Sequence, residues 1–210
     1  YVNRNVDEDD SVESYTGKIF ESAMASLAQV HHSLDMSAVN RAVDLLTQAK
    51  KIAFFGLGSS AAVAHDAMNK FFRFNVPVIY SDDIVLQRMS CMNCDDDDVV
   101  VIISHTGRTK SLVELAQLAR ENDAMVIALT SAGTPLAREA TLAITLDVPE
   151  DTDIYMPMVS RLAQLTVIDV LATGFTLRRG AKFRDNLKRV KEALKESRFD
   201  KEPFVPCDNQ

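Results

Sequence analysis

The sequence lacks tryptophan altogether and holds only seven glycines, six prolines and three cysteines among its 210 residues. So little glycine and proline excludes a collagen-like or low-complexity chain, and an apolar share of 47% indicates one ordinary globular domain. The apolar runs are strand-sized, far below the roughly 20 residues that span a bilayer, and the acidic N-terminus has no signal-peptide pattern. We therefore expect a cytoplasmic protein with no membrane partner.

Scarce cysteine excludes a secreted disulfide framework. Cys91 and Cys94 have C-x-x-C spacing, but one such pair, at the end of a candidate helix and without a histidine cluster, is a poor zinc or redox site. We expect packing cysteines and no metal or other cofactor. The aspartates at 95–98 predict a solvated turn, with calcium binding as the lesser alternative because the ligand spacing and a glycine are missing.

Net positive charge is also missing, since the chain carries a formal net charge of −7. That balance argues against direct binding to nucleic acid, which requires clustered lysine and arginine. The basic residues that follow position 178 have the spacing of a solvated face on an amphipathic helix.

Short apolar runs alternate with helical patterns, which predicts βαβ units and a parallel sheet. The expected strands are 52–56, 76–81, 99–104, 124–130 and 142–148, and the expected helices between them are 60–74, 83–93, 109–121 and 134–139. Because the strands are apolar throughout, we predict an α/β fold, a doubly wound five-stranded parallel sheet of flavodoxin-like order with helices on both faces.

Further helices are expected on either side of this alternating region. A helical lead-in covers 14–34 and 37–50, with Ser37 as N-cap, and a long, very apolar helix covers 156–177. These helices display more apolar surface than one face of the sheet can cover, so we expect a homodimer or higher homo-oligomer. The expected units are a lead-in (1–37), the α/β domain (38–178) and a C-terminal helix and tail (179–210).

Two loops at strand ends predict an anion site. Gly56 and Gly58 precede a helix that opens with Ser59 and Ser60, so backbone N–H groups and hydroxyls can reach a phosphate. A second loop follows the third strand and contributes Ser104, His105, Thr106, Gly107, Arg108 and Thr109. In flavodoxin-like order the two loops flank one crevice, where a single phosphate ester could touch both.

Each loop also has a plainer or a competing interpretation. Ser104 or Thr109 could simply cap a helix. The spacing Gly56-x-Gly58-x-x-Ala61, followed by Asp82 and Asp83, also satisfies the dinucleotide fingerprint, so a NAD-binding domain stays open as a third hypothesis.

The motifs "GLGSS" and "SHTGRT" resemble those of the SIS (sugar isomerase) domains over about residues 38–178. The resemblance implies phosphate contacts from Ser104, Thr106 and Thr109, with Ser59 and Ser60 lining the same pocket. The wider match, which includes "ALTSAGTPLA" and "MPMVSRLAQLTVIDVLATGF", resembles the effector domains of RpiR-type bacterial transcription factors.

Within that group the chain is most similar to repressors of sugar-acid (glucose/gluconate, Entner-Doudoroff) catabolism, whose effector is 2-keto-3-deoxy-6-phosphogluconate. Such regulators bind DNA through an N-terminal helix-turn-helix domain. No such domain is visible here, and the acidic start without methionine suggests a fragment, so we expect DNA to be a partner only through that absent part.

Some SIS proteins are isomerases, which need a base and a ring-opening acid. Their catalytic Glu and His can follow the second strand, but here that segment, "SDDIVLQRMSCM", has neither. The remaining candidates are His65, His105, Glu150 and Asp151. We therefore expect a sensor without catalytic residues, with an aldose-ketose isomerase as the alternative.

A sugar acid also requires a cation for its carboxylate, and a guanidinium suits it best. We assign this role to Arg88, with Arg108 and Arg161 as rivals and a plain surface arginine as the simpler interpretation. Ser160, on the first turn of the long apolar helix, could also approach the ligand, although an ordinary polar first turn explains it equally.

Overall fold

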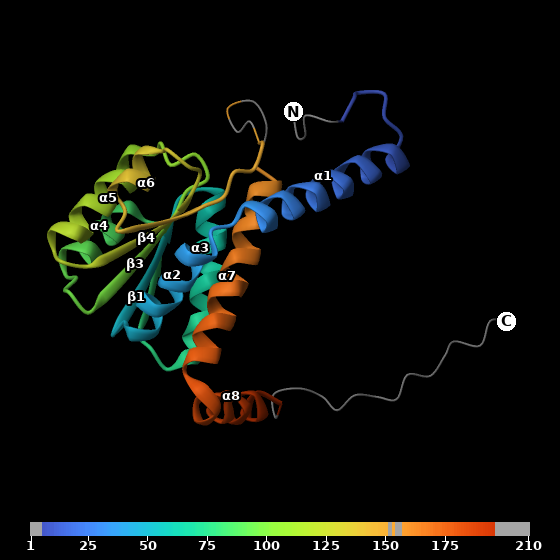
Figure 1. Cartoon of the computed structure of the whole chain (residues 1–210). Coiled ribbons are helices and arrows are strands. Elements are labelled where there is room, and N and C mark those ends of the chain that lie inside the picture. Colours follow the sequence, from blue (N-terminus) through green and yellow to red (C-terminus); the bar gives the residue numbers. More distant parts are fainter. Residues whose placement is uncertain (1–5, 151–152, 154–156, 196–210) are drawn as a thin grey trace, which may run out of the picture.

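The computed structural model describes residues 6–150, 153 and 157–195, which Figure 1 shows as an α/β sandwich with projecting ends. The five strands are β1 (Lys51–Gly56), β2 (Val78–Ser81), β3 (Asp98–Ile103), β4 (Met125–Thr130) and β5 (Leu142–Thr145). All their pairings are parallel, in the order β2-β1-β3-β4-β5. The predicted flavodoxin-like sheet is therefore confirmed.

Two strands are at least two residues shorter than the sequence suggests. Strand β5 ends at Thr145 because β4, its neighbour, ends at Thr130, and only the Leu146 N–H still reaches the Thr130 carbonyl. Strand β2 begins at Val78 because Pro77 has no N–H, although its carbonyl accepts a hydrogen bond from Ile52.

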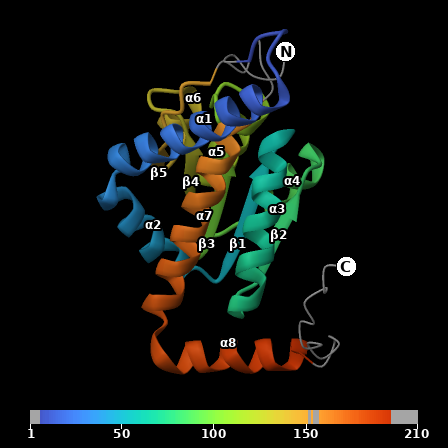
Figure 2. The ribbon, with the colours of Figure 1, turned by 90° about the vertical axis from the view of Figure 1, so that its right-hand side faces the viewer.

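Helices cover both faces of the sheet, as predicted for a doubly wound fold (Figures 1 and 2). One face packs against the layer α1 (Val12–Ser33), α2 (Met36–Gln48), α3 (Ser59–Phe71) and α7 (Val159–Arg178), and the other packs against α4 (Ile84–Met92), α5 (Lys110–Glu121) and α6 (Pro135–Glu139). Strand side chains alternate between the two cores: Phe54 faces the first layer and Phe55 the second.

A short 3-10 turn, η1 (Phe72–Phe74), follows α3, and α8 (Gly180–Lys195) lies across the end of α7 (Figure 2). Phe74, Phe175 and Phe183 stack together at this junction, with ring centroids 5.0 to 5.9 Å apart. This aromatic contact fixes the start of α8, whose remaining surface is open.

The predicted N-cap of the second helix is wrong by two residues. Asp35, not Ser37, caps α2, because its carboxylate accepts hydrogen bonds from the backbone N–H groups of Ser37 and Ala38. An aspartate gives a charged acceptor at the positive end of the helix, so it wins over a serine located inside the first turn.

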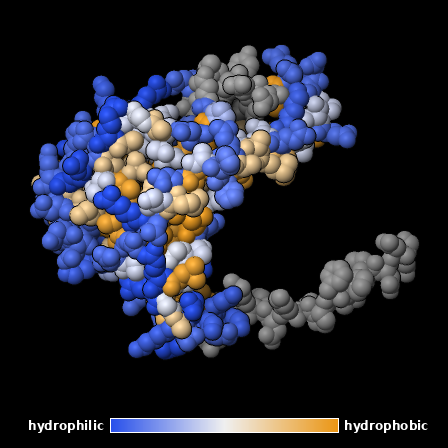
Figure 3. Space-filling model, in the orientation of Figure 1, coloured by the Kyte–Doolittle hydropathy of each residue, from blue (hydrophilic) through white to orange (hydrophobic). Residues whose placement is uncertain are grey.

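Apolar side chains stay exposed along the first helical layer. Phe20 and Met24 on α1 and Leu162 and Val170 on α7 are more than a third exposed, and Figure 3 shows apolar surface over the region of α7. Among the described residues, no helix is long and apolar enough to cross a membrane.

Candidate phosphate site

The two predicted loops start side by side. Strands β1 and β3 are neighbours, and their last residues, Gly56 and Ile103, pair with each other. Adjacent strands lie about 4.8 Å apart, so the loop at 57–60 and the loop at 104–109 leave the same edge of the sheet at the same height. This edge is the switch point of the strand order, where open α/β sheets bind ligands.

The first loop turns on Gly58, whose φ of +57° lies in a region that favours glycine. Gly56 is needed for a different reason: a Cβ there would meet the Ser60 carbonyl at 2.7 Å. Gly58 occupies the N-cap position of α3, so no side chain caps this helix. Ser59 and Ser60 begin its first turn. Ser60 is nearly buried and Ser59 is half-buried.

The second loop is held by its own hydrogen bonds. The Ser104 hydroxyl, which is buried, accepts a hydrogen bond from the Gly107 N–H at 3.2 Å, and Thr106 Oγ1 accepts one from the Arg108 N–H at 3.4 Å. The His105 carbonyl accepts a hydrogen bond from the Ser131 hydroxyl at 2.8 Å. His105 itself is half-buried. Thr109 is the N-cap residue of α5 but makes no capping hydrogen bond with its side chain.

The two helices that start at this edge differ in their caps from four other helices of the described chain. The four helices α1, α2, α4 and α6 are capped by side chains, namely those of Ser11, Asp35, Asp83 and Thr134. Helices α3 and α5 begin at the two loops and have no side-chain cap. The N–H groups of Ser60, Ala61 and Leu112 already donate to carbonyls of the two loops. The partial positive charge of each helix start and the N–H groups that precede these residues can still meet an anion.

The start of α7 is occupied from within the chain. Glu150 accepts hydrogen bonds from the N–H groups of Met158, Val159 and Ser160, at 2.6, 2.8 and 3.1 Å. Burial acts to raise the pKa of Glu150, but the hydrogen bonds from the Ser160 hydroxyl and these N–H groups outweigh it, so the pKa lies below its ordinary 4.5. Ser160 is buried and bonded to Glu150 rather than open to a crevice.

The candidate catalytic groups are not gathered into one set. Glu150 serves as the cap of α7, and Asp151 lies outside the described residues. His65 stacks on Tyr80 of β2, with centroids 4.8 Å apart. Asp83, an acid of the dinucleotide fingerprint, instead caps α4 with hydrogen bonds from Val85 and Leu86.

The three arginine candidates differ in their partners. Arg88 on α4 forms an ion pair with Glu114 of α5 at 3.3 Å, and half of its side chain is exposed. Arg108 forms an ion pair with Asp153, at 3.0 Å. Arg161 has a buried Nε atom without a hydrogen-bond partner. The assignment of the carboxylate to Arg88 stays a prediction.

Sequence reasoning missed Gln87. This side chain is fully buried on α4, and its Nε2 donates to the carbonyls of Gly56, at 3.2 Å, and Ser81, at 2.7 Å. It therefore ties α4 to the ends of β1 and β2 beside the first loop. A single glutamine in a helical pattern gives no signal of this role, because only the tertiary fold brings those carbonyls to it.

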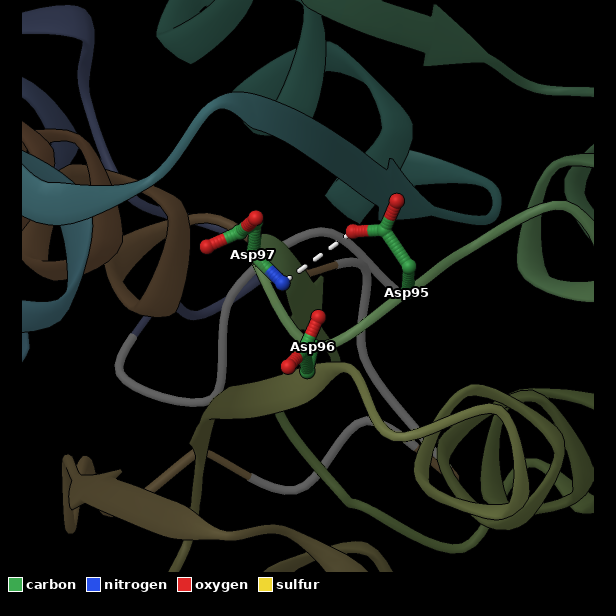
Figure 4. Close-up of side chains that lie close together, drawn as sticks. All are labelled: Asp95, Asp96 and Asp97. Atoms are coloured by element: carbon green, nitrogen blue, oxygen red, sulfur yellow. Dashed lines mark hydrogen bonds between the residues drawn. The ribbon is translucent and has the colours of Figure 1, made fainter.

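The acidic turn, Cys91 and Cys94 lie apart from this edge. Asp95, Asp96 and Asp97 are exposed at the amino end of β3, and the Asp97 N–H donates to Asp95 at 3.1 Å (Figure 4). Burial raises the pKa of the Cys91 thiol to about 12, which leaves that thiol protonated at neutral pH. Cys207 lies outside the described residues.

Comparison with known proteins identifies the family of this chain. The chain matches the SIS domain family over residues 45–174. It is 94% identical over 210 residues to the HTH-type transcriptional regulator HexR of Escherichia coli, a match that covers all of this chain and 73% of that protein. It is 56% identical over 199 residues to HexR of Pseudomonas aeruginosa, covering 95% of this chain and 70% of that protein.

Among solved structures, that of Vibrio vulnificus NanR complexed with ManNAc-6P has the same fold, with a TM-score of 0.82 over 89% of this chain and 71% of that chain, at 24% identity. The chain belongs to the SIS-domain family and, within it, to the HexR-type transcriptional regulators. The two HexR proteins are transcriptional regulators, which favours a regulator over an isomerase or a NAD-binding domain.

Proposed function

We propose that this chain is the effector-sensing domain of a transcriptional regulator and that its effector is a phosphorylated sugar acid, 2-keto-3-deoxy-6-phosphogluconate. The observation that carries the proposal is the pair of uncapped helix starts at the ends of β1 and β3. They bring the positive ends of two helices to one edge of the sheet, together with the hydroxyls of Ser59, Ser60, Ser104, Thr106 and Thr109.

Such an arrangement suits a phosphate monoester. Helix N-termini favour a negative charge, and hydroxyls donate charge-assisted hydrogen bonds to phosphate oxygens. Gly58 is exposed and a Cβ there would meet nothing within 4 Å, so its backbone can approach the ligand closely. The solved complex of NanR with ManNAc-6P has a sugar phosphate bound to a protein of the same fold, which supports the ligand class proposed here.

In the regulator, the effector would act by binding one arrangement of a homodimer more tightly than another, and so reposition the DNA-binding domains. The size of that shift is limited by the difference between the two affinities. The exposed apolar side chains of α1 and α7 support a subunit interface on the first helical layer.

A thermal-shift panel tests the ligand class. Phosphorylated sugar acids, neutral sugar phosphates and NAD are each added to the chain, and a ligand that binds only the folded state raises its unfolding temperature. We expect the largest rise with 2-keto-3-deoxy-6-phosphogluconate. A rise with NAD alone, or conversion of an aldose phosphate to a ketose phosphate, would contradict the proposal.

A further inference from the structure

A cavity of about 270 Å³ lies between the first two turns of α3 and those of α7. Its lining is apolar except for one arginine: Ala62, Val63, Met158, Arg161, Leu162 and Leu165. Val63 is one helical turn from Ser60, or roughly 4.5 Å along α3. The cavity therefore begins within the length of a small sugar phosphate from the first loop.

Arg161 is unusual among the arginines near this edge. Its Nε atom is buried and has no hydrogen-bond partner, and no ion pair links its guanidinium to another described residue. Arg88 and Arg108 both have carboxylate partners. A buried donor on a charged group is unfavourable without an acceptor, and the apolar walls strengthen its attraction for an anion.

We propose that Arg161, in place of the Arg88 favoured from the sequence, binds the carboxylate of the effector while the phosphate of the same molecule occupies the loops at Ser60 and Ser104. This inference rests on the proposed function and concerns the other end of the ligand. A carboxylate fits the site because a planar guanidinium can donate two parallel hydrogen bonds to its two oxygens. A neutral sugar phosphate would leave the arginine unpaired, so Arg161 makes the site selective for an acid.

Titration calorimetry with two ligands tests the assignment. The wild type and Arg161→Met are each titrated with 2-keto-3-deoxy-6-phosphogluconate and with glucose 6-phosphate, whose sugar end is neutral. Loss of a charge-assisted pair should weaken binding of the acid by about tenfold to a hundredfold, while binding of glucose 6-phosphate changes by less than about twofold. Arg161→Lys keeps the positive charge but cannot donate two parallel hydrogen bonds. Its affinity for the acid should therefore fall less than that of Arg161→Met.

Arg120→Met is the matched control. Arg120 lies at the far end of α5, where its guanidinium donates a hydrogen bond to the Glu139 carbonyl. We expect the affinities of this variant for the two ligands to equal those of the wild type. Suppose that the wild type binds both ligands. If Arg161→Met then weakens the binding of both ligands equally, or changes the binding of neither, the inference is overturned while the proposed function stands. If the wild type binds neither ligand, the proposed function fails and the inference fails with it.

Discussion

Replacing Gly107 with alanine should damage the second loop in two separable ways. The backbone of Gly107 has φ of +58°, a left-handed conformation that costs an alanine about 1–2 kcal/mol. An added Cβ would also lie within 3.0 Å of the hydroxyls of Thr130 and Thr134. The Thr134 hydroxyl cannot simply turn away, because it accepts from the Ala137 N–H as the cap of α6 and donates to the Ser131 carbonyl.

Losing that cap adds about 1 kcal/mol, so Gly107→Ala should lower the free energy of unfolding by about 2–3 kcal/mol in total. Urea unfolding with a common slope for both proteins measures this difference. Because the clash would displace the loop, binding of the phosphorylated ligand should weaken in the same variant.

Gly133→Ala is the control that isolates the clash. Gly133 also has a positive φ, +69°, and precedes Thr134, but a Cβ there would meet nothing within 4 Å. Its free energy of unfolding should fall only by the cost of placing an alanine in a left-handed conformation, about 1–2 kcal/mol. Equal losses in the two variants would refute the steric argument, and no loss in either would refute the left-handed conformations themselves.

Three further predictions address the site and the assembly. Ser60→Ala and Ser104→Ala should each weaken binding of a phosphosugar by about 1.5–3 kcal/mol in titration calorimetry. Circular dichroism should show that both variants keep the fold. Wild-type affinity in both variants would show that the loops do not bind the phosphate. Glu150→Gln should cost about 1–2 kcal/mol of folding stability at pH 7, because the folded carboxylate has a lowered pKa and its contribution is present above its unfolded pKa. That difference from wild type should shrink as the pH falls below about 4.5, and a difference that grows in acid would reverse the sign of the argument. Sedimentation equilibrium should give at least a dimer, weakened by Met24→Glu on the exposed face of α1, whereas a stable wild-type monomer at micromolar concentration would contradict the interface.

The sequence alone determined the sheet and the position of the two loops. Continuous apolar runs such as the one at 99–104 are typical of strands buried on both faces, and β3 lies within one residue of that expectation. The glycines and hydroxyls of each loop are consecutive in the chain, so local chemistry was enough to predict them. The predicted strand ends were wrong where the neighbouring strand sets the end, as at the end of β5, which stops where β4 stops.

The tertiary structure decided everything that depends on groups distant in the chain. Glu150 was a candidate acid in the sequence and is the cap of α7 in the fold, because the loop after β5 returns its carboxylate to three N–H groups. Sequence spacing likewise does not show the carboxylate partners of Arg88 and Arg108. Nor does it show that the buried Nε atom of Arg161 has no hydrogen-bond partner among the described residues. Periodicity reports which face of a helix is buried, but it cannot report which polar group on another element meets it there.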